Sequence, residues 1–313
     1  SKMMHRGFGI LSFVVALVVY LLTVQPTVPF SDCGEFTSAA IWQQVPHPPG
    51  APLFLMIGKI FSMIIPFGDM AWRVNLVSVF SSAFSVWLLY LISVKVIFHF
   101  RKKEVDDTSD ALAIYGSSFI GAMALVFSDT FWFNAVESEV YALSALFVAL
   151  VVFLMMKWNE EADKPGSERY LLLIAYLIGL STGVHLLSIL AIFSIVYIVY
   201  FRKYTVKPSS FIITGIVSVI IFFIIYPGIV QWIPSMLAGH MPFKNECREY
   251  IITSPVTSFL VIASIVAAAI GLWWGYKHKL HILNLICGAF LLMIIGYSTY
   301  TQILLRSNAN PPM

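Results

Sequence analysis

The sequence predicts an all-α integral membrane protein, a polytopic helical bundle with about nine transmembrane helices. Of the 313 residues, 59% are hydrophobic and only 11% are charged, and the mean hydropathy is +0.86. Apolar runs recur along the whole chain, and in lipid such runs satisfy their backbone polar groups within helices. The period-two alternation of a transmembrane β-barrel is missing from the sequence.

The first span is predicted over residues 8–24. Lys2 and Arg6 precede it, and a basic flank favours the cytoplasmic side. Gln25 and Pro26 follow, so the small-residue cleavage site of a signal peptide is not present there. Residues 27–71 are therefore predicted to form a first exoplasmic loop.

The next apolar run, residues 53–65, decides the orientation of every later loop. It holds 13 residues between Pro52 and Pro66, with Lys59 mid-way. A helix of that length reaches about 20 Å, against a hydrocarbon core of about 30 Å. We therefore expect a helix that lies at the interface or re-enters the membrane partway.

The remaining spans then alternate in direction, and the charges test that assignment. Of the 19 Lys and Arg residues, 14 fall inside and five outside, as the positive-inside rule expects. The inverted topology would send the basic cluster 101–103 outward. Residues 227–255 become a second large exoplasmic loop. The spans are residues 72–98, 111–127, 140–156, 170–182, 186–200, 211–226, 256–276 and 282–305.

One pair of spans is short, because only 32 residues separate Arg169 from Arg202 and both are predicted to be cytoplasmic. Two helices of about 15 residues each reach only about 22 Å. Their connection is therefore expected to be recessed, which places His185 at membrane depth.

Acidic residues lie close to the membrane surface on the predicted exoplasmic side, and two of them stand in SDCGEFTSAAIWQQVPHPPG, residues 31–50. Acids near basic groups and a membrane recess suit a lipid phosphate together with a hydroxyl that is to be activated. A structural role is the alternative for the first two acids. Asp32 could cap a helix, and Glu35 could complete a capping box with Ser31.

Four segments in order carry a resemblance that covers essentially the whole chain: residues 31–61, FNAVESEVYALSALF, GLSTGVHLLSILAI and the terminal GYSTYTQILLRSNANPPM. They resemble a bacterial family of polytopic proteins related to the protein O-mannosyltransferase transmembrane protein 260, within the GT-C superfamily of glycosyltransferases. The resemblance implies interfacial helices in the first loop, an essential acid after the first span and a polyprenyl-phosphate sugar donor. Asp32 matches that acid, and HPPGAPLF, which contains His47, resembles a segment that opens an interfacial helix. Some relatives carry a lysine near the place of His185, so the phosphate role of this histidine departs from the pattern.

The function implied is transfer of a sugar, mannose or another hexose, to a hydroxyl of an exported protein or glycan, with inversion. Such a transfer needs a base, cations for the leaving phosphate and shielding from water. Asp32 is the candidate base, and Glu35 shares that role or positions the acceptor. The candidates for the donor phosphate are Arg73, His185 and Lys59, with Arg306 as a weaker one. The candidates for substrate binding are His47, Glu137, Glu139 and Tyr141.

Several of these residues also have simpler interpretations. Glu137 and Glu139 stand where a span begins, so interaction with the helix N-terminus explains them without a substrate. Arg73 could anchor the interface beside Trp72, and Tyr141 fits the interfacial aromatic belt. His47 precedes two prolines and could simply end a turn.

The mechanism requires no cofactor. Binding of a divalent metal ion by Asp32, Glu35 and His47 is an alternative that the sequence leaves open, although the spacing of these residues matches no defined metal motif. The expected partners are the donor, the acceptor and membrane lipid, and no basic-aromatic patch indicates nucleic acid. Cys33 and Cys247 could form a disulfide. The protein is expected in the bacterial inner membrane with its active site on the periplasmic side.

Two other function classes remain in view. A transporter or flippase for lipid-linked sugars would show repeat symmetry and acids within its spans, whereas the acids here cluster outside them. A non-catalytic membrane assembly subunit would tolerate loss of Asp32. We expect residues 1–313 to form a single transmembrane domain of GT-C type, whose terminal NANPPM resembles a junction into a further soluble region.

Overall fold

The computed structural model describes residues 2–103, 105–237 and 255–307. All regular structure in these ranges is helical, and eight helices are long and apolar enough to cross a membrane. The predicted fold class is thus confirmed. The chain divides into two compact units: unit 1 holds the chain up to Met156, Gly183–Ser188 and the segment from Thr299, and unit 2 holds Lys157–Thr182 and Ile189–Ser298. The single-domain assignment of residues 1–313 stays a prediction.

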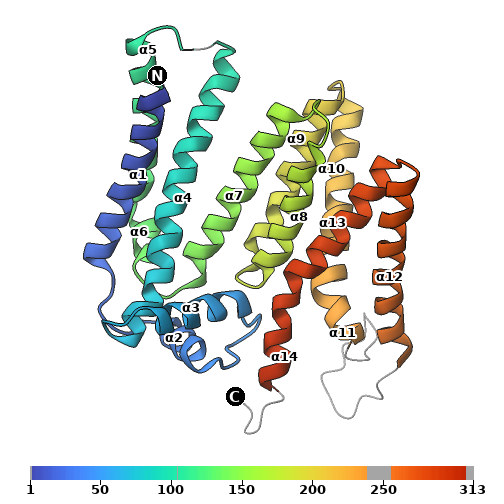
Figure 1. Ribbon diagram of the computed structural model, residues 1–313, viewed down its shortest axis with the longest axis horizontal. Coiled ribbons are helices and arrows are strands. Elements are labelled where there is room, and N and C mark those ends of the chain that lie inside the picture. The colour runs from blue at the N-terminus through green and yellow to red at the C-terminus, as the bar shows by residue number, and fades with distance from the viewer. Residues whose placement is uncertain (1, 104, 238–254, 308–313) are drawn as a thin grey trace. The chain divides into compact units, whose positions relative to one another are not determined.

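Unit 1 is built on α1 (Lys2–Thr23), α4 (Met70–Arg101), α5 (Thr108–Val126) and the start of α7 (Val140–Glu161). At one end of these helices the Nδ1 of His5 lies 3.1 Å from the Tyr90 hydroxyl. At the other end the backbone N–H of Gln25 donates to the carbonyl of Val136 at 3.0 Å. The long helices therefore run back and forth, as predicted, and the first loop leaves from the end opposite the N-terminus (Figure 1).

The first loop contains two helices that are too short to span a membrane, α2 (Cys33–Trp42) and α3 (Pro52–Ile64). Both lie at the end of unit 1 where α4 begins (Figure 1). Pro52 is the first residue of α3, a position where its missing N–H costs no helical hydrogen bond. A side chain at Gly58 would place its Cβ 2.9 Å from that of Ala40, so glycine permits the close packing of α3 on α2.

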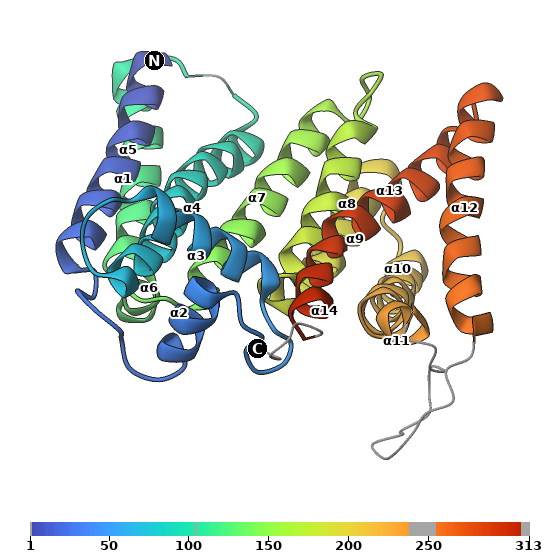
Figure 2. The ribbon, with the colours of Figure 1, turned by 60° about the horizontal axis from the view of Figure 1, so that its bottom comes forward.

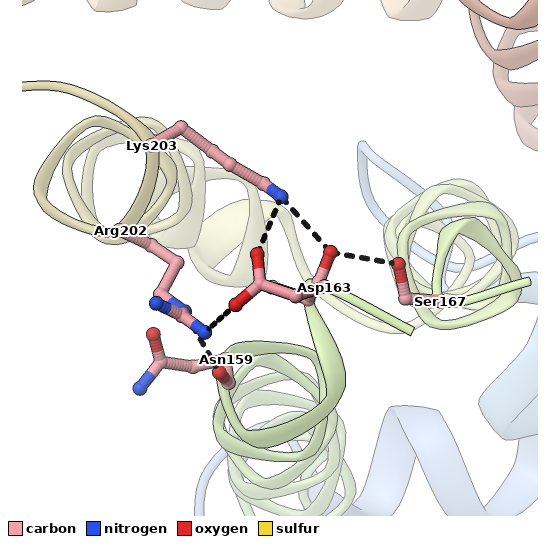
Figure 3. Close-up of polar contacts among 6 residues, drawn as sticks. Asn159, Asp163, Ser167, Arg202 and Lys203 are labelled. Carbon is pink, nitrogen blue, oxygen red and sulfur yellow. Dashed lines mark hydrogen bonds and ion pairs between the residues drawn. The ribbon is translucent and has the colours of Figure 1, made fainter. Parts of the chain in front are cut away.

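Unit 2 contains α8 (Glu168–Thr182), α9 (Ala191–Lys203), α10 (Pro208–Phe223), α12 (Pro255–Lys277) and α13 (His281–Tyr297). The 3-10 helix η1 (Leu186–Leu190) precedes α9 and begins within the segment of unit 1 that ends at Ser188. The fifth predicted span is α8, which has only 15 residues and is not among the eight long helices. Asp163, just beyond α7, forms ion pairs with Arg202 and Lys203 at the end of α9 (Figure 3). The chain therefore goes out along α8 and returns along α9, as the sequence predicts.

Helices α8 and α13 approach each other at two glycines. A Cβ at Gly179 would overlap the backbone carbonyl of Met293, and one at Gly296 would lie 2.5 Å from the carbonyl oxygen of Tyr176. Because the obstacles are backbone atoms, neither site has room for a larger residue.

Three segments differ from the sequence-based expectation. The span predicted to end at residue 226 continues instead through the π-helix η2 (Ile224–Trp232) into α11 (Ile233–Leu237). A proline inside an α-helix loses a hydrogen bond and clashes with a carbonyl, and the wider π-turn at Pro227 accommodates it. The second large loop therefore begins only after residue 237, and residues 238–254, with Cys247, lie outside the described residues.

The last predicted span, residues 282–305, is broken at its end. Helix α13 stops at Tyr297, and the 3-10 helix η3 (Ser298–Tyr300) leads into α14 (Thr301–Ser307), which belongs to unit 1. A short helix that the sequence did not predict, α6 (Asp129–Ala135), connects α5 to α7.

Candidate active site

Asp32 stands at the N-cap position of α2, yet its side chain makes no capping hydrogen bond. The preceding residue, Ser31, has a φ of +66°, a strained conformation for a residue other than glycine. The Asp32 side chain is exposed, and among the described residues its carboxylate accepts no hydrogen bond. The structural alternative of a helix cap is therefore not realised, and this carboxylate is accessible to a ligand.

Glu35 and His47 form the central polar contact of the first loop. The Nδ1 of His47 lies 2.8 Å from Oε2 of Glu35, and the backbone N–H of His47 donates to Oε1 at 2.6 Å. The hydrogen bond to the imidazole lowers the pKa of Glu35 and raises the pKa of His47. Nearby negative charge on Asp32 and Glu139 further raises the pKa of His47. Glu35 thus binds the turn before α3 and does not close a capping box.

Two more acids approach from the turn between α6 and α7. Glu137 and Glu139 are only 5% and 8% exposed. The Cys33 thiol donates to Oε1 of Glu139 over 3.7 Å. Burial raises the pKa of Glu137 to about 7, and the charge on Glu139 adds to this effect. Interaction with the amino terminus of α7 does not by itself explain two buried acids that also face α2.

Hydroxyl groups fasten α2 to this turn. The Oγ1 of Thr37 lies 2.7 Å from the Oγ of Ser138, and Ser138 also donates to the carbonyl of Cys33 at 3.2 Å. Sequence reasoning did not single out Thr37 or Ser138, because no local spacing links residues 101 positions apart. Four acids and one histidine are thereby held on three connected segments: Asp32, Glu35, His47, Glu137 and Glu139. We call this set the acidic cluster.

The connection between α8 and α9 reaches unit 1 close to the start of α7. The His185 ring lies 5.4 Å from the ring of Tyr141, and the N–H of Leu53, in α3, donates to the carbonyl of Gly183 at 2.7 Å. His185 thus lies beside Tyr141 on α7, which follows Glu139 by two positions in the sequence. Its membrane depth stays a prediction.

Two candidates for the donor phosphate, Lys59 and Arg73, donate hydrogen bonds to backbone carbonyls of unit 1. Lys59 donates to the carbonyl of Ile41 at 2.6 Å, at the end of α2. Arg73 donates to the carbonyls of Ser62 and Phe67, both at 3.1 Å, and so closes the turn between α3 and α4. Neither side chain forms an ion pair with the acidic cluster in the described part of the chain. Their role at a donor phosphate stays a prediction, and the structure gives each a fold-supporting role.

Within the described residues, no group of three or more His, Cys, Asp or Glu side chains is arranged to hold a metal ion, Asp32, Glu35 and His47 included. That the reaction needs no cofactor stays a prediction. The Cys33 thiol is buried against Glu139, while its proposed disulfide partner lies outside the described residues.

The sequence profile of one family, described as Protein O-mannosyl-transferase TMEM260 N-terminal domain, matches residues 32–208. The chain belongs to this family. The TMEM260 N-terminal domain match begins at Asp32 and runs from α2 to the first residue of α10, so it contains the whole acidic cluster.

Two relatives from the TMEM260 group support the assignment. Protein O-mannosyl-transferase tmem260 of Dictyostelium discoideum is 29% identical over 164 residues, which are 51% of this chain and 18% of that protein. Protein O-mannosyl-transferase TMEM260 of Mus musculus is 28% identical over 169 residues, which are 54% of this chain and 22% of that protein. The matched part thus spans less than a quarter of either relative. No solved structure matches the chain.

Proposed function

We propose that the chain is a membrane glycosyltransferase of GT-C type, which transfers mannose or another hexose from a polyprenyl-phosphate donor to a hydroxyl of an exported protein or glycan. Membership in the family named for a protein O-mannosyl-transferase supports the reaction class. The observation that carries the site is the exposed Asp32 carboxylate, which caps no helix and accepts no hydrogen bond in the described chain.

In the proposed reaction, Asp32 accepts the proton of the acceptor hydroxyl. The acceptor oxygen forms a bond to the anomeric carbon while the bond from that carbon to the phosphate oxygen breaks, which inverts the anomeric centre. Polyprenyl phosphate leaves with the electron pair. His185, Arg73 and Lys59 are the proposed partners of its charge, and no metal or other cofactor takes part.

The other members of the acidic cluster have supporting roles in this proposal. Glu35 and His47 hold the turn before α3 against α2, one helical turn from Asp32. Glu137 has a raised pKa and can stay protonated near neutral pH, so it can donate a hydrogen bond to a sugar oxygen. Glu139 and Tyr141 lie beside it at the start of α7.

The location proposed is the bacterial inner membrane, with the acidic cluster on the periplasmic side. The support is the excess of Lys and Arg at the opposite ends of the spans. The alternatives that the sequence left open, a flippase for lipid-linked sugars and a non-catalytic assembly subunit, would not depend on the basicity of one exposed carboxylate.

The test is transfer of radiolabelled mannose from polyprenyl-phosphate mannose to exported proteins or glycans, in membranes that carry the native chain or Asp32→Asn at equal abundance. Loss of a general base is expected to slow transfer by about 100-fold or more. Asp69→Asn is the matched control: Asp69 lies in the same loop but caps α4 by accepting from the N–H of Ala71, and asparagine caps equally well.

Equal transfer by Asp32→Asn and native membranes would rule out Asp32 as the base. Native membranes can also be tested with every polyprenyl-phosphate sugar, and with any natural continuation of the chain. If they transfer nothing, that result would favour the flippase or the assembly subunit.

A further inference from the structure

The last helix of the described chain, α14, is fastened to the first loop. Nε of Arg306 donates to the carbonyl of Gln43 at 2.6 Å, and Nη2 donates to the carbonyl of Trp42 at 3.2 Å. Ile303 packs against Gly50, whose φ of +94° and lack of a side chain allow this approach. Both views place α14 beside the loop between α2 and α3 (Figure 1 and Figure 2).

This contact brings α14 to the turn that carries His47. The N–H of Gly50 donates to the carbonyl of His47 at 3.0 Å, so Ile303 rests on a turn closed by the histidine itself. The segment lies outside the residues that match the family profile, which end at residue 208. Helix α14 therefore lies next to the turn of His47, although it belongs to a part of the chain that the family profile does not match.

Two side chains next to these contacts carry buried polar atoms without partners. Both amide atoms of Gln302, Nε2 and Oε1, are buried and form no hydrogen bond, and the same holds for Oγ1 of Thr299. Among the described residues, no other side chain has two such atoms. A buried polar atom without a partner is costly, and native proteins keep few of them, so three such atoms on two side chains within one turn of the chain call for a partner that the described residues do not supply.

Thr299, Gln302 and Arg306 lie on the same face of the helical segment formed by η3 and α14. Gln302 lies four residues before Arg306 on α14, and positions four apart in a helix lie on the same face. Thr299 lies three residues before Gln302, in η3, where residues three apart eclipse each other. The unpartnered atoms are thus aligned with the arginine that holds α14 to the first loop.

We propose that Gln302 and Thr299 form a subsite for the ring hydroxyls of the transferred hexose, an inference that rests on the proposed function. A carboxamide donates through Nε2 and accepts through Oε1, so it can pair with two neighbouring hydroxyls of one sugar ring. The hydroxyl of Thr299 can pair with a third. Because both side chains are neutral, they suit a neutral polyhydroxyl group, whereas the donor phosphate calls for cations.

The test uses Gln302→Met, which keeps the length of the side chain and removes both polar atoms. Purified chain in detergent is titrated with polyprenyl-phosphate mannose and with bare polyprenyl phosphate, and the dissociation constant of each lipid is measured by thermal shift. We expect the variant to lose about tenfold or more of its affinity for the sugar lipid and to keep its affinity for the bare lipid. Gln25→Met is the matched control, since that glutamine is exposed.

Donors that lack one ring hydroxyl sharpen the test and separate the donor from the acceptor. A deoxy donor that lacks one of the two hydroxyls bound by Gln302 should show a smaller difference in affinity between the native chain and Gln302→Met, while other deoxy donors should keep the full difference. A difference that followed the identity of the acceptor, and not that of the donor sugar, would overturn the assignment to the transferred hexose.

The outcomes for this subsite and for the proposed function can be told apart. Unchanged binding and transfer in Gln302→Met, with native activity present, would show that water fills the subsite and would overturn the inference alone. Selective loss of sugar-lipid binding in a chain that transfers nothing would uphold the subsite and reject the transferase. If Gln302→Met fails to fold, Thr299→Val provides the same comparison for the third unpartnered atom.

Discussion

At the scale of single residues, the contact between Glu35 and His47 joins α2 to the turn before α3. The hydrogen bond between the two side chains favours the charged form of each, because it raises the pKa of His47 and lowers the pKa of Glu35. The His47 contribution to stability is complete below its ordinary pKa of 6.5 and is lost as the pH rises through the raised pKa. The Glu35 contribution is complete above its ordinary pKa of 4.5 and is lost as the pH falls through the lowered pKa. The pair is therefore strongest between these two values.

This pH window can be measured with His47→Gln. The native chain should unfold at a higher temperature than the variant at pH 5.5, and the difference should shrink at pH 8.5, where the imidazole is neutral. The side chains are 46% and 43% exposed, so solvent limits the effect to about 1 kcal/mol or less. The bond from the His47 backbone to Glu35 does not depend on the side chain and should persist.

His99→Gln is the control for this measurement, because His99 is exposed at the end of α4 and, in the described chain, bonds to no acid. A stability difference between native and His47→Gln chains that is the same at both pH values would show that packing of the ring, and not its charge, supports the turn.

At the scale of elements, the pair α8 and α13 depends on two glycines. Gly179→Ala or Gly296→Ala would push a methyl group into the backbone of the partner helix. Because a backbone atom cannot move alone, we expect each substitution to destabilise unit 2 by about 1–3 kcal/mol. Thermal unfolding of the purified variants in detergent measures the effect.

Gly121→Ala in α5 is the matched control, since a Cβ there meets nothing within 4 Å and alanine favours the helix. Native stability in both Gly179→Ala and Gly296→Ala would mean that the two helices can separate without loss, contrary to the packing of unit 2.

At the scale of the whole molecule, the distribution of Lys and Arg sets an orientation that can be tested. The ion pairs of Asp163 with Arg202 and Lys203 place the connection after α7 and the end of α9 on one side. In a chain whose Cys33, Cys247 and Cys287 are replaced by alanine, Thr27→Cys should react with a membrane-impermeant maleimide in intact cells. Lys164→Cys should react only after the membrane is opened. The reverse pattern would invert the topology and place the acidic cluster in the cytoplasm.

The sequence predicted most of the fold because transmembrane helices are local structures. An apolar run of sufficient length satisfies its backbone within itself, so the eight long helices follow from composition. The 13-residue run after Pro52 is likewise a short helix because of its length alone. The continuation of α10 through Pro227 was missed, because a π-turn depends on how the backbone relaxes around the proline.

The candidate site was predicted only in part. Asp32 and Glu35 could be named from one short polar segment in an apolar chain. Their partners could not: Cys33 and Glu139 are 106 positions apart, and Arg306 reaches Gln43 across 263. Such pairs are selected by the packing of helices, which leaves no periodic signal in either segment.

The sequence by itself determined that this is a polytopic helical membrane protein, which residues form most of its long apolar helices, and that acids stand in the first loop. Only the tertiary structure decided what those acids touch. It joined Glu35 to His47, buried Glu137 and Glu139 against α2, and brought α14, which carries the unpartnered amide of Gln302, to the same loop through Arg306. The physical reason is that helix formation in lipid depends on local hydrogen bonds and apolar surface, whereas a site depends on contacts between segments that are distant in the chain.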